Sequence, residues 1–179
     1  MFENIRRDLA TYKGDASRQG FWVMLVYRFG RWRYGLRPRF VRAPFSALYK
    51  ILYKCVQIAT GIELPCETRV GTGLRIDHFG GVVVSGFAVL GDHCILRNGV
   101  VIGLRNPEQP VAPKIGNHVD IGAGAKILGD IHIGDHARIG ANAVVLRDVP
   151  AHAAAVGVPA RIVRRRILQT AEKPMRLPA

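Results

Sequence analysis

Aliphatic residues recur every six positions through the middle of the chain. The clearest series is Ile115, Ile121, Ile127, Ile133, Ile139 and Val145, and an earlier series is Val84, Leu90, Leu96 and Ile102. A helix of 3.6 residues per turn would not return the same face every six residues, whereas the two-residue alternation of a strand divides six. Each unit is therefore predicted to be one short strand and a turn.

Three such units close one triangular coil, and stacked coils bury the aliphatic positions in a continuous interior. Glycine follows the aliphatic residue in several units, where it permits a positive φ or a close approach of backbones. We expect about five coils over residues 62–163. The interval from Ile102 to Ile115 is 13 residues and holds three prolines, which predicts a loop leaving the coil. Such a loop is either functional or a harmless insertion.

Residues 1–61 are predicted to be helical. The expected helices are Glu3–Tyr12, Phe21–Tyr34 and Pro44–Ala59, with Asp15 or Ser17 as a cap and Gly61 as the stop. The third helix carries an apolar stripe at Phe45, Leu48, Ile51, Leu52, Cys55 and Val56. We expect this stripe to pack on the coils or on a neighbouring subunit. The alternative is a basic amphipathic surface that rests on a membrane.

The net charge of +13 lies at the two ends of the chain. Residues 1–60 carry +9, residues 61–163 are neutral, and the tail of residues 164–179 carries +4. Basic ends attract anionic partners such as phosphorylated cofactors or anionic lipid. No nucleic-acid motif accompanies the charge, so a nucleic-acid partner is not expected.

The longest apolar run, Phe21–Tyr27, has seven residues, far below the roughly 20 that a membrane helix needs. No signal peptide is recognisable. The three cysteines form no CxxC pair, so neither a disulfide framework nor a zinc knuckle is indicated. We expect a cytoplasmic protein, with peripheral contact at the inner membrane face as the open alternative.

Several strings of the chain resemble a known family. They are Val26-Tyr27-Arg28-Phe29-Gly30-Arg31-Trp32, Ile76-Asp77-His78, Ile121-Gly122-Ala123-Gly124-Ala125-Lys126-Ile127-Leu128-Gly129 and Gly157-Val158-Pro159-Ala160-Arg161-Ile162-Val163. Over residues 8–165 the chain resembles the hexapeptide-repeat acyltransferases, and among them serine acetyltransferases and colanic-acid-type polysaccharide O-acetyltransferases. The resemblance implies a mainly β fold, a left-handed parallel β-helix after an N-terminal α-helical region.

The resemblance also implies homotrimers that bind acetyl-CoA along a groove between adjacent β-helices. It makes His78 the general base, Glu63 its orienting carboxylate, and Asp77 and Asp15 acceptor-binding residues. The residues expected to meet acetyl-CoA are Gly103 at the oxyanion, Ala123, Gly124 and Ala141 along the pantetheine arm, and Lys126, Arg161 and Arg164 at the phosphates.

One departure from the family bears on the acceptor. Serine acetyltransferases carry an arginine-histidine pair before the sequence Pro-Lys-Ile, where this chain has Val111 and Ala112. Neither side chain can pair with the carboxylate of serine. We therefore expect O-acetylation of a sugar hydroxyl in a cell-surface polysaccharide or its precursor. Serine O-acetylation is the alternative, and an inert trimeric scaffold is an alternative of another class.

Acetyl transfer to an alcohol requires removal of the hydroxyl proton, for which a histidine with a pKa near about 6.5 is suited. The other five histidines invite a zinc site, but zinc needs converging imidazoles, and no metal is expected. Cys66 and Cys94 are candidate nucleophiles for a covalent intermediate. Cys94 falls at a core position of its repeat, so direct transfer is preferred.

Overall fold

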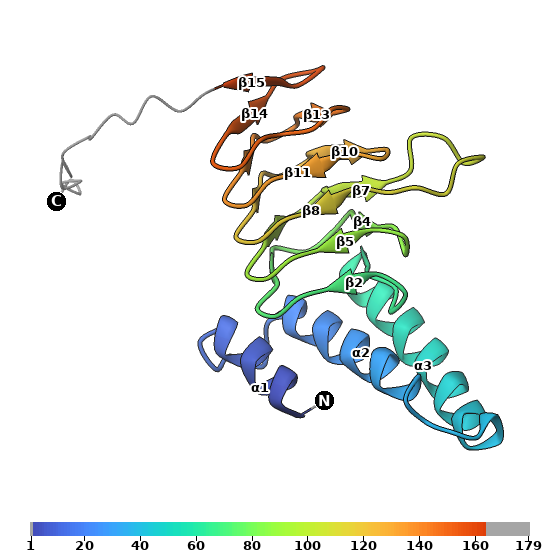
Figure 1. Ribbon diagram of the computed structural model, residues 1–179. Coiled ribbons are helices and arrows are strands. Elements are labelled where there is room, and N and C mark those ends of the chain that lie inside the picture. Colours follow the sequence, from blue (N-terminus) through green and yellow to red (C-terminus); the bar gives the residue numbers. More distant parts are fainter. Residues whose placement is uncertain (1, 164–179) are drawn as a thin grey trace, which may run out of the picture.

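The computed structural model describes residues 2–163, and the basic tail from Arg164 onward lies outside them. A β-solenoid stands on three helices (Figure 1): α1 (Phe2–Thr11), α2 (Gln19–Arg33) and α3 (Arg39–Thr60). The left-handed parallel β-helix expected after an N-terminal helical region is confirmed. No helix within residues 2–163 is both long enough and apolar enough to cross a bilayer.

The solenoid has three faces, each a parallel sheet. Sheet A contains β1 (Ile62–Glu63), β4 (Val82–Val84), β7 (Val101–Gly103), β10 (Lys126–Leu128) and β13 (Val144–Val145). Sheet B contains β2 (Arg69–Val70), β5 (Val89–Leu90), β8 (Lys114–Ile115) and β11 (His132–Ile133). Sheet C contains β3 (Arg75–Asp77), β6 (Ile95–Arg97), β9 (Asp120–Ile121), β12 (Arg138–Ile139), β14 (Ala154–Val156) and β15 (Arg161–Val163). Five strands in sheet A correspond to five coils.

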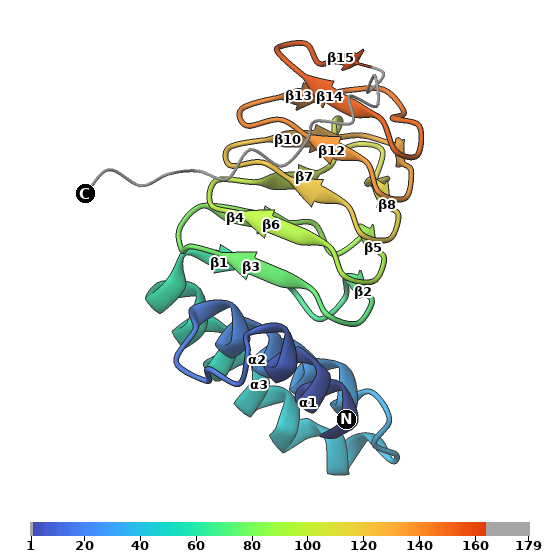
Figure 2. The ribbon, with the colours of Figure 1, turned by 90° about the vertical axis from the view of Figure 1, so that its left-hand side faces the viewer.

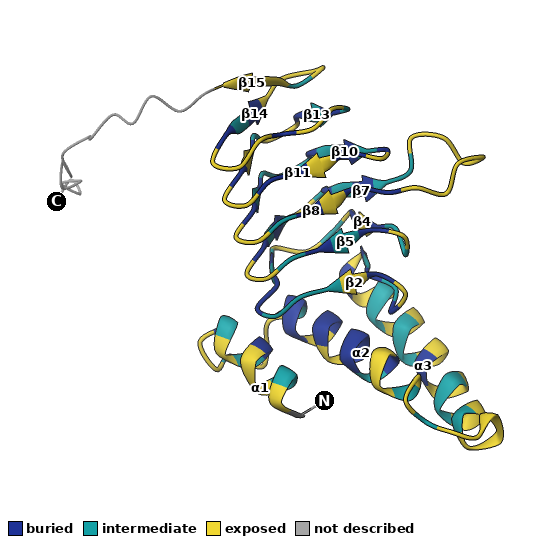
Figure 3. Ribbon diagram, viewed as in Figure 1, coloured by how far each residue is buried: buried dark blue, intermediate teal, exposed yellow. Residues whose placement is uncertain are grey.

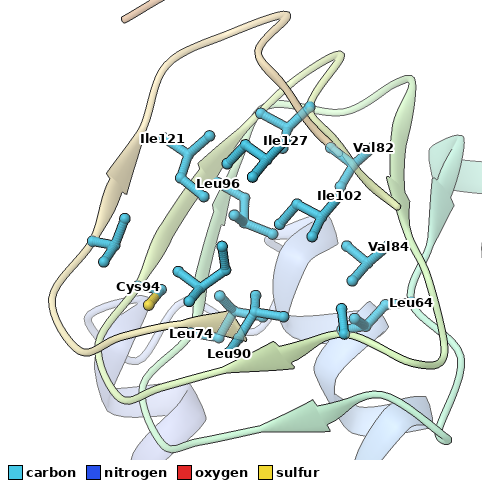
Figure 4. Packing of buried hydrophobic residues seen from close by; sticks show 14 of the residues in the cluster. Leu64, Leu74, Val82, Val84, Leu90, Cys94, Leu96, Ile102, Ile121 and Ile127 are labelled. Atoms are coloured by element: carbon cyan, nitrogen blue, oxygen red, sulfur yellow. The ribbon is translucent and has the colours of Figure 1, made fainter. Parts of the chain in front are cut away.

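The repeated aliphatic positions form one continuous core (Figure 4). Leu96, Ile102, Ile121 and Ile127 are completely buried and point into the interior of the coils. Neighbouring coils pair in register, so that Ile127 lies beside Ile102 on one side and Val145 on the other. The six-residue period therefore works as predicted, because it returns an inward-facing side chain to each face on each coil.

Both ends of the solenoid are covered. At the base, the buried part of α2 lies next to the first coil (Figure 3), and Tyr27 accepts a hydrogen bond from Val70 N and donates one to the Thr68 carbonyl. At the top, β15 turns back and pairs antiparallel with β14, whereas the other strand pairs are parallel. The helical layer lies below the coils from a perpendicular direction too (Figure 2).

A buried ion pair fixes α1 to α2 and to the first coil. Arg28 Nε and Nη2 donate to Asp8 at 2.8 and 3.1 Å, and both residues are buried. Arg28 Nη2 also donates to the carbonyl of Gly71, at 2.7 Å. Because both charges are fully partnered, α1 is tied to the solenoid through polar contacts.

A column of histidines marks one corner of the solenoid. His93, His118, His136 and His152 all have positive φ, and successive rings stack with centroids 5.1, 4.8 and 4.9 Å apart. The corner turn needs a left-handed backbone, and histidine is one of the few side chains found there repeatedly. The glycines that follow the aliphatic positions act differently: a Cβ on Gly122 would lie 2.5 Å from Ala141 N, so close approach requires glycine there.

The predicted helix ends fall within about two residues of the observed ones except at the start of the third helix, and the predicted cap also differs. The third helix begins at Arg39, five residues before the predicted Pro44, because Pro44 is accommodated inside the helix and Pro38 precedes its start. The cap prediction at α2 is wrong: the N-cap residue is Arg18, without a side-chain cap. Asp15 instead accepts hydrogen bonds from Ser17 and Arg18. Gly61 ends α3 as predicted, with a φ of 65°.

Candidate active site

His78 lies at the corner between sheets C and A, directly after β3 and four residues before β4. Its φ is 64° and its side chain is exposed. The corner rests on the end of α3, since Gly80 N donates to the Thr60 carbonyl at 2.9 Å. The turn thus presents the imidazole outward at the junction of the helices and the first coil.

A hollow of about 460 Å³ lies in front of this corner, between β3 and the connection from α1 to α2. Its lining includes Lys13, Arg18, Arg75, Asp77, His78 and Phe79. His78 and Asp77, both predicted site residues, therefore share one pocket. We call this hollow the acceptor pocket.

The wall of the acceptor pocket is fixed by a contact between Tyr12 and β3. Ile76 N donates to Tyr12 Oη at 2.9 Å, and burial raises the pKa of Tyr12 to about 12. Gly20 lies against the same point, because a Cβ there would be 2.6 Å from the Ile76 carbonyl oxygen. The start of α2 therefore reaches the strand that carries Asp77 only because residue 20 is glycine.

Both predicted acceptor aspartates are paired with arginines. Arg75 Nε and Nη2 donate to Asp77 Oδ2 at 3.1 and 2.8 Å. Arg18 Nε donates to Asp15 Oδ2 at 2.9 Å. Hydrogen bonds from Ser17 hold the pKa of Asp15 below its usual value. Asp15 is thus linked to the acceptor pocket through Arg18, and neither carboxylate faces the pocket without a cation beside it.

Glu63 occupies β1, on the sheet A side of the same corner. Within the described residues its carboxylate accepts a hydrogen bond from Gln57 Nε2, at 2.6 Å, rather than from His78. Gln57 Oε1 in turn accepts from Lys54 Nζ at 3.1 Å. The structure places Glu63 near the corner that carries His78, while the orienting contact that the resemblance implies stays a prediction.

The predicted loop is present, at a different corner. Residues 104–113 leave the solenoid between β7 and β8, where sheet A passes to sheet B (Figure 1). Val111 is exposed and Ala112 is buried. Within one chain this loop and His78 therefore occupy different corners of the triangle. A site that uses both has to combine two copies of the chain.

The residues predicted to meet acetyl-CoA lie along the upper coils. Gly103 ends β7 beside Leu128, and the corner residues Ala123 and Gly124 follow β9. Lys126 Nζ donates to the Gly99 carbonyl at 2.6 Å, so its ammonium is engaged by the corner below it. Ala141 is exposed at the next corner and Arg161 is exposed on β15. Arg164 lies outside the described residues.

The candidate nucleophiles Cys94 and Cys66 lie outside the acceptor pocket. Cys94 is buried, and burial raises the pKa of its thiol to about 11. Cys66 is also buried, beneath Tyr49 and Arg33. Within residues 2–163, the histidines and their neighbours include no group of three or more side chains that could hold a metal ion.

Several residues at the site were missed by the sequence reasoning. Arg18 and Arg75 neutralise the aspartates, Gln57 holds Glu63, and Tyr12 fixes the pocket wall. The two arginines could have been predicted as partners of the aspartates, because Arg18 lies three residues after Asp15 and Arg75 lies two residues before Asp77. Gln57 and Tyr12 act through the packing of the helices on the first coil, which no local pattern reveals.

Comparisons with known proteins identify the family. The family model "Bacterial transferase hexapeptide (six repeats)" matches residues 112–147. A serine acetyltransferase of Synechococcus elongatus is 39% identical over 147 residues, which are 82% of this chain and 57% of that protein. The putative colanic acid biosynthesis acetyltransferase WcaB of Escherichia coli is 39% identical over 120 residues, 67% of this chain and 72% of that protein.

Solved structures of serine acetyltransferases have a similar fold. Serine acetyltransferase from Brucella abortus in complex with coenzyme A superposes with a TM-score of 0.76 at 33% identity, covering 90% of this chain and 67% of that one. The chain spans a little over half the length of the curated serine acetyltransferases that it matches. With its repeats, its solenoid and these relatives, the chain belongs to the hexapeptide-repeat acyltransferase family.

Proposed function

We propose that the chain is an acetyl-CoA-dependent O-acetyltransferase that acts on a sugar hydroxyl of a cell-surface polysaccharide or its precursor. Membership of the family supports acetyl transfer. The coenzyme A complex of the Brucella abortus relative supports the donor, and the name of WcaB supports a polysaccharide acceptor.

The pairing of Asp15 and Asp77 with arginines is the observation that carries the choice of acceptor. Arg18 and Arg75 already neutralise the two carboxylates, so the ammonium group of free serine would gain less from either carboxylate and would be repelled by the guanidinium beside it. A neutral sugar meets no such repulsion, because its hydroxyl groups donate hydrogen bonds to carboxylates and accept them from guanidinium groups.

Phe79 supports the same acceptor. Its side chain is 63% exposed, follows His78 directly and lines the acceptor pocket. An exposed aromatic ring is a suitable surface for the apolar C–H face of a sugar ring. The pocket would then hold the acceptor between Phe79 and the arginine–aspartate pairs, with the hydroxyl group toward His78.

In the proposed reaction, a ring nitrogen of His78 accepts the proton of the acceptor hydroxyl as the oxygen forms a bond to the thioester carbonyl carbon. The carbon–sulfur bond then breaks, and the departing sulfur takes the proton from His78 to leave as the thiol. A positioned base of this kind contributes about 10²–10⁴-fold to the rate. Glu63 is proposed as the positioning residue that fixes the imidazole when substrates are bound.

A homotrimer is part of this proposal. The loop of residues 104–113 and His78 occupy different corners of one chain, so a neighbouring copy must bring the loop to the pocket. The outer face of sheet A carries Val83, Val101 and Val144, which suits contact with another solenoid. Light scattering is expected to give three times the chain mass of 19.7 kDa.

Serine O-acetylation is the second candidate, favoured by the names of several curated relatives. Release of the coenzyme A thiol should be measured with serine and, in parallel, with a panel of sugars. We expect turnover with a sugar and none above background with serine. Turnover with serine alone would overturn the acceptor proposal, and failure to bind acetyl-CoA in calorimetry would favour an inert scaffold.

A further inference from the structure

The outer surface of the α2–α3 hairpin carries large apolar side chains that are exposed in the described part of the chain. On α2, Trp22, Leu25 and Trp32 are spaced by three and seven residues and are 37–43% exposed. Phe45 of α3 packs against Trp32 and Phe29, with ring centroids 5.5 and 6.5 Å apart. The two helices therefore share one aromatic surface on the side that does not face the first coil.

On α3, the predicted apolar stripe divides into two. Phe45, Leu52 and Val56 are half-buried against the rest of the chain, whereas Leu48, Ile51 and Cys55 are exposed. Phe40 and Ile58 extend the exposed part, each 77% accessible, and Ile51 is 61% accessible. Leu48, Ile51, Cys55 and Ile58 follow a spacing of three or four residues, and Phe40 lies eight residues before Leu48, so they share one side of the helix. We name Trp22, Trp32, Phe40, Leu48, Ile51 and Ile58 the hairpin face.

The charge around the hairpin face has a single sign. Residues 16–62 contain nine Lys and Arg and no Asp or Glu. Arg37, Arg39 and Arg42 line a hollow at the tip of the hairpin, beside Phe40. Lys50 and Lys54 are exposed along α3, next to the apolar line. The helices that carry the hairpin face thus contribute cations and no carboxylate, which fits a partner that is apolar and anionic together. Glu63 and Glu67 of the first coil meet the hairpin through Gln57 and Tyr34.

We propose that the hairpin face docks on the surface of an anionic lipid bilayer, with the apolar side chains at the headgroup–acyl boundary and the Lys and Arg side chains among the headgroups. Helices of this type lie in the plane of the interface, and tryptophan is enriched at that depth. Docking between two copies of the face would bring two clusters of cations together without a counter-charge, which is unfavourable. The inference is independent of the proposed acetyl transfer.

Both tryptophans of the chain lie on the hairpin face, so intrinsic fluorescence reports on it directly. The full chain should be mixed with vesicles of phosphatidylcholine and phosphatidylglycerol, and with vesicles of phosphatidylcholine alone. We expect sedimentation with the anionic vesicles and a blue shift of the tryptophan emission. Raising the salt concentration should weaken sedimentation, because surface charges are screened.

Two double variants test the two parts of the face. Ile51→Gln with Ile58→Gln removes apolar contact, and Arg39→Gln with Lys50→Gln removes charge. Each is expected to lower the partition coefficient for anionic vesicles about tenfold or more. All four side chains are exposed, so folding is retained. The matched control is Phe87→Gln with Val158→Gln, which removes two equally exposed apolar side chains from the solenoid and should leave partitioning unchanged.

The proposal is overturned if the chain does not sediment with anionic vesicles at low salt. It is also overturned if the isoleucine variant partitions like the unmodified chain, or if the control variant loses as much binding. If the isoleucine variant instead lowers the mass in solution without changing sedimentation, the face joins copies of the chain. Acetyl transfer measured on soluble acceptors is expected to be the same in every variant, which separates this test from that of the proposed function.

Discussion

Arg75 lies two residues before Asp77 on β3, and its guanidinium donates two hydrogen bonds to a single oxygen of that carboxylate. The pair lies in the acceptor pocket, and Asp77 immediately precedes His78. On the same sheet, Arg97 of β6 is paired with Asp120 of the next strand, β9, and Arg97 also lies in register beside Asp77. The two pairs are alike in exposure, but only the first borders the proposed base.

Arg75→Gln is therefore expected to lower kcat/KM for the sugar acceptor about tenfold or more, because Asp77 loses the group that orients it and neutralises it. The KM for acetyl-CoA should not change. Thiol-release kinetics with each substrate varied in turn measure both quantities. Arg69→Gln changes an exposed arginine on sheet B of the same coil, outside the acceptor pocket, and is the control that should retain activity; equal losses in the two variants would show that the effect is structural.

His78→Asn should reduce turnover by about 10²–10⁴-fold, since the base is removed. The left-handed backbone at residue 78 suits asparagine, and the side chain is exposed. The circular dichroism spectrum and the affinity for acetyl-CoA are therefore expected to stay the same. A variant that retains most of its turnover would contradict the assignment of His78.

Asp8→Asn should destabilise the folded chain by about 3–5 kcal/mol, because it leaves the Arg28 charge buried without its carboxylate. Urea unfolding followed by fluorescence measures the free energy of unfolding. The control is Glu3→Gln, which breaks the exposed pair of Glu3 with Arg7 and should cost about 0–1 kcal/mol. Similar losses of unfolding free energy in both variants would show that the buried Asp8–Arg28 pair stabilises the chain no more than the exposed pair does.

Gly20→Ala should weaken the attachment of α2 to β3, since the added Cβ would lie 2.6 Å from the Ile76 carbonyl oxygen and closer still to Tyr12 Oη. Overpacking of this kind costs about 1–3 kcal/mol, and the KM for the acceptor should rise because the pocket wall moves. Gly35→Ala is a suitable control, with 3.3 Å to its nearest neighbour, the Trp32 carbonyl oxygen. Unchanged stability and KM in Gly20→Ala would argue against the contact.

Cys94 should resist thiol reagents in the folded chain while the exposed Cys55 reacts readily.

Burial raises the pKa of Cys94 from 9.0 to about 11. The unfolded thiol thus loses its proton at lower pH than the folded one, so the stability that Cys94 contributes falls as pH rises from 9 to 11. Between pH 9 and 11, the urea concentration at the unfolding midpoint should fall less steeply with pH in Cys94→Ala than in the unmodified chain. An equal pH dependence in both proteins would contradict the raised pKa of Cys94.

The six-residue period was enough to predict the solenoid because Ile121, Ile127 and their equivalents face the interior on every coil. The candidate base was also accessible from sequence, since Asp77-His78 forms part of a recognisable string. The pairing of Asp15 with Arg18 was not predicted, because Asp15 has the appearance of a helix cap. The contact between Gln57 and Glu63 depends on how α3 meets the first coil, and no local periodicity encodes that angle.

The antiparallel pairing of β15 with β14 limits how copies of the chain can associate. A parallel stack leaves unpaired N–H and C=O groups at its last coil, and these groups would accept another solenoid end to end. By turning back on β14, β15 occupies part of that edge with a strand of opposite direction, while the helices occupy the first coil. End-to-end growth is thereby hindered at sheet C, which favours association through the sides of the triangle.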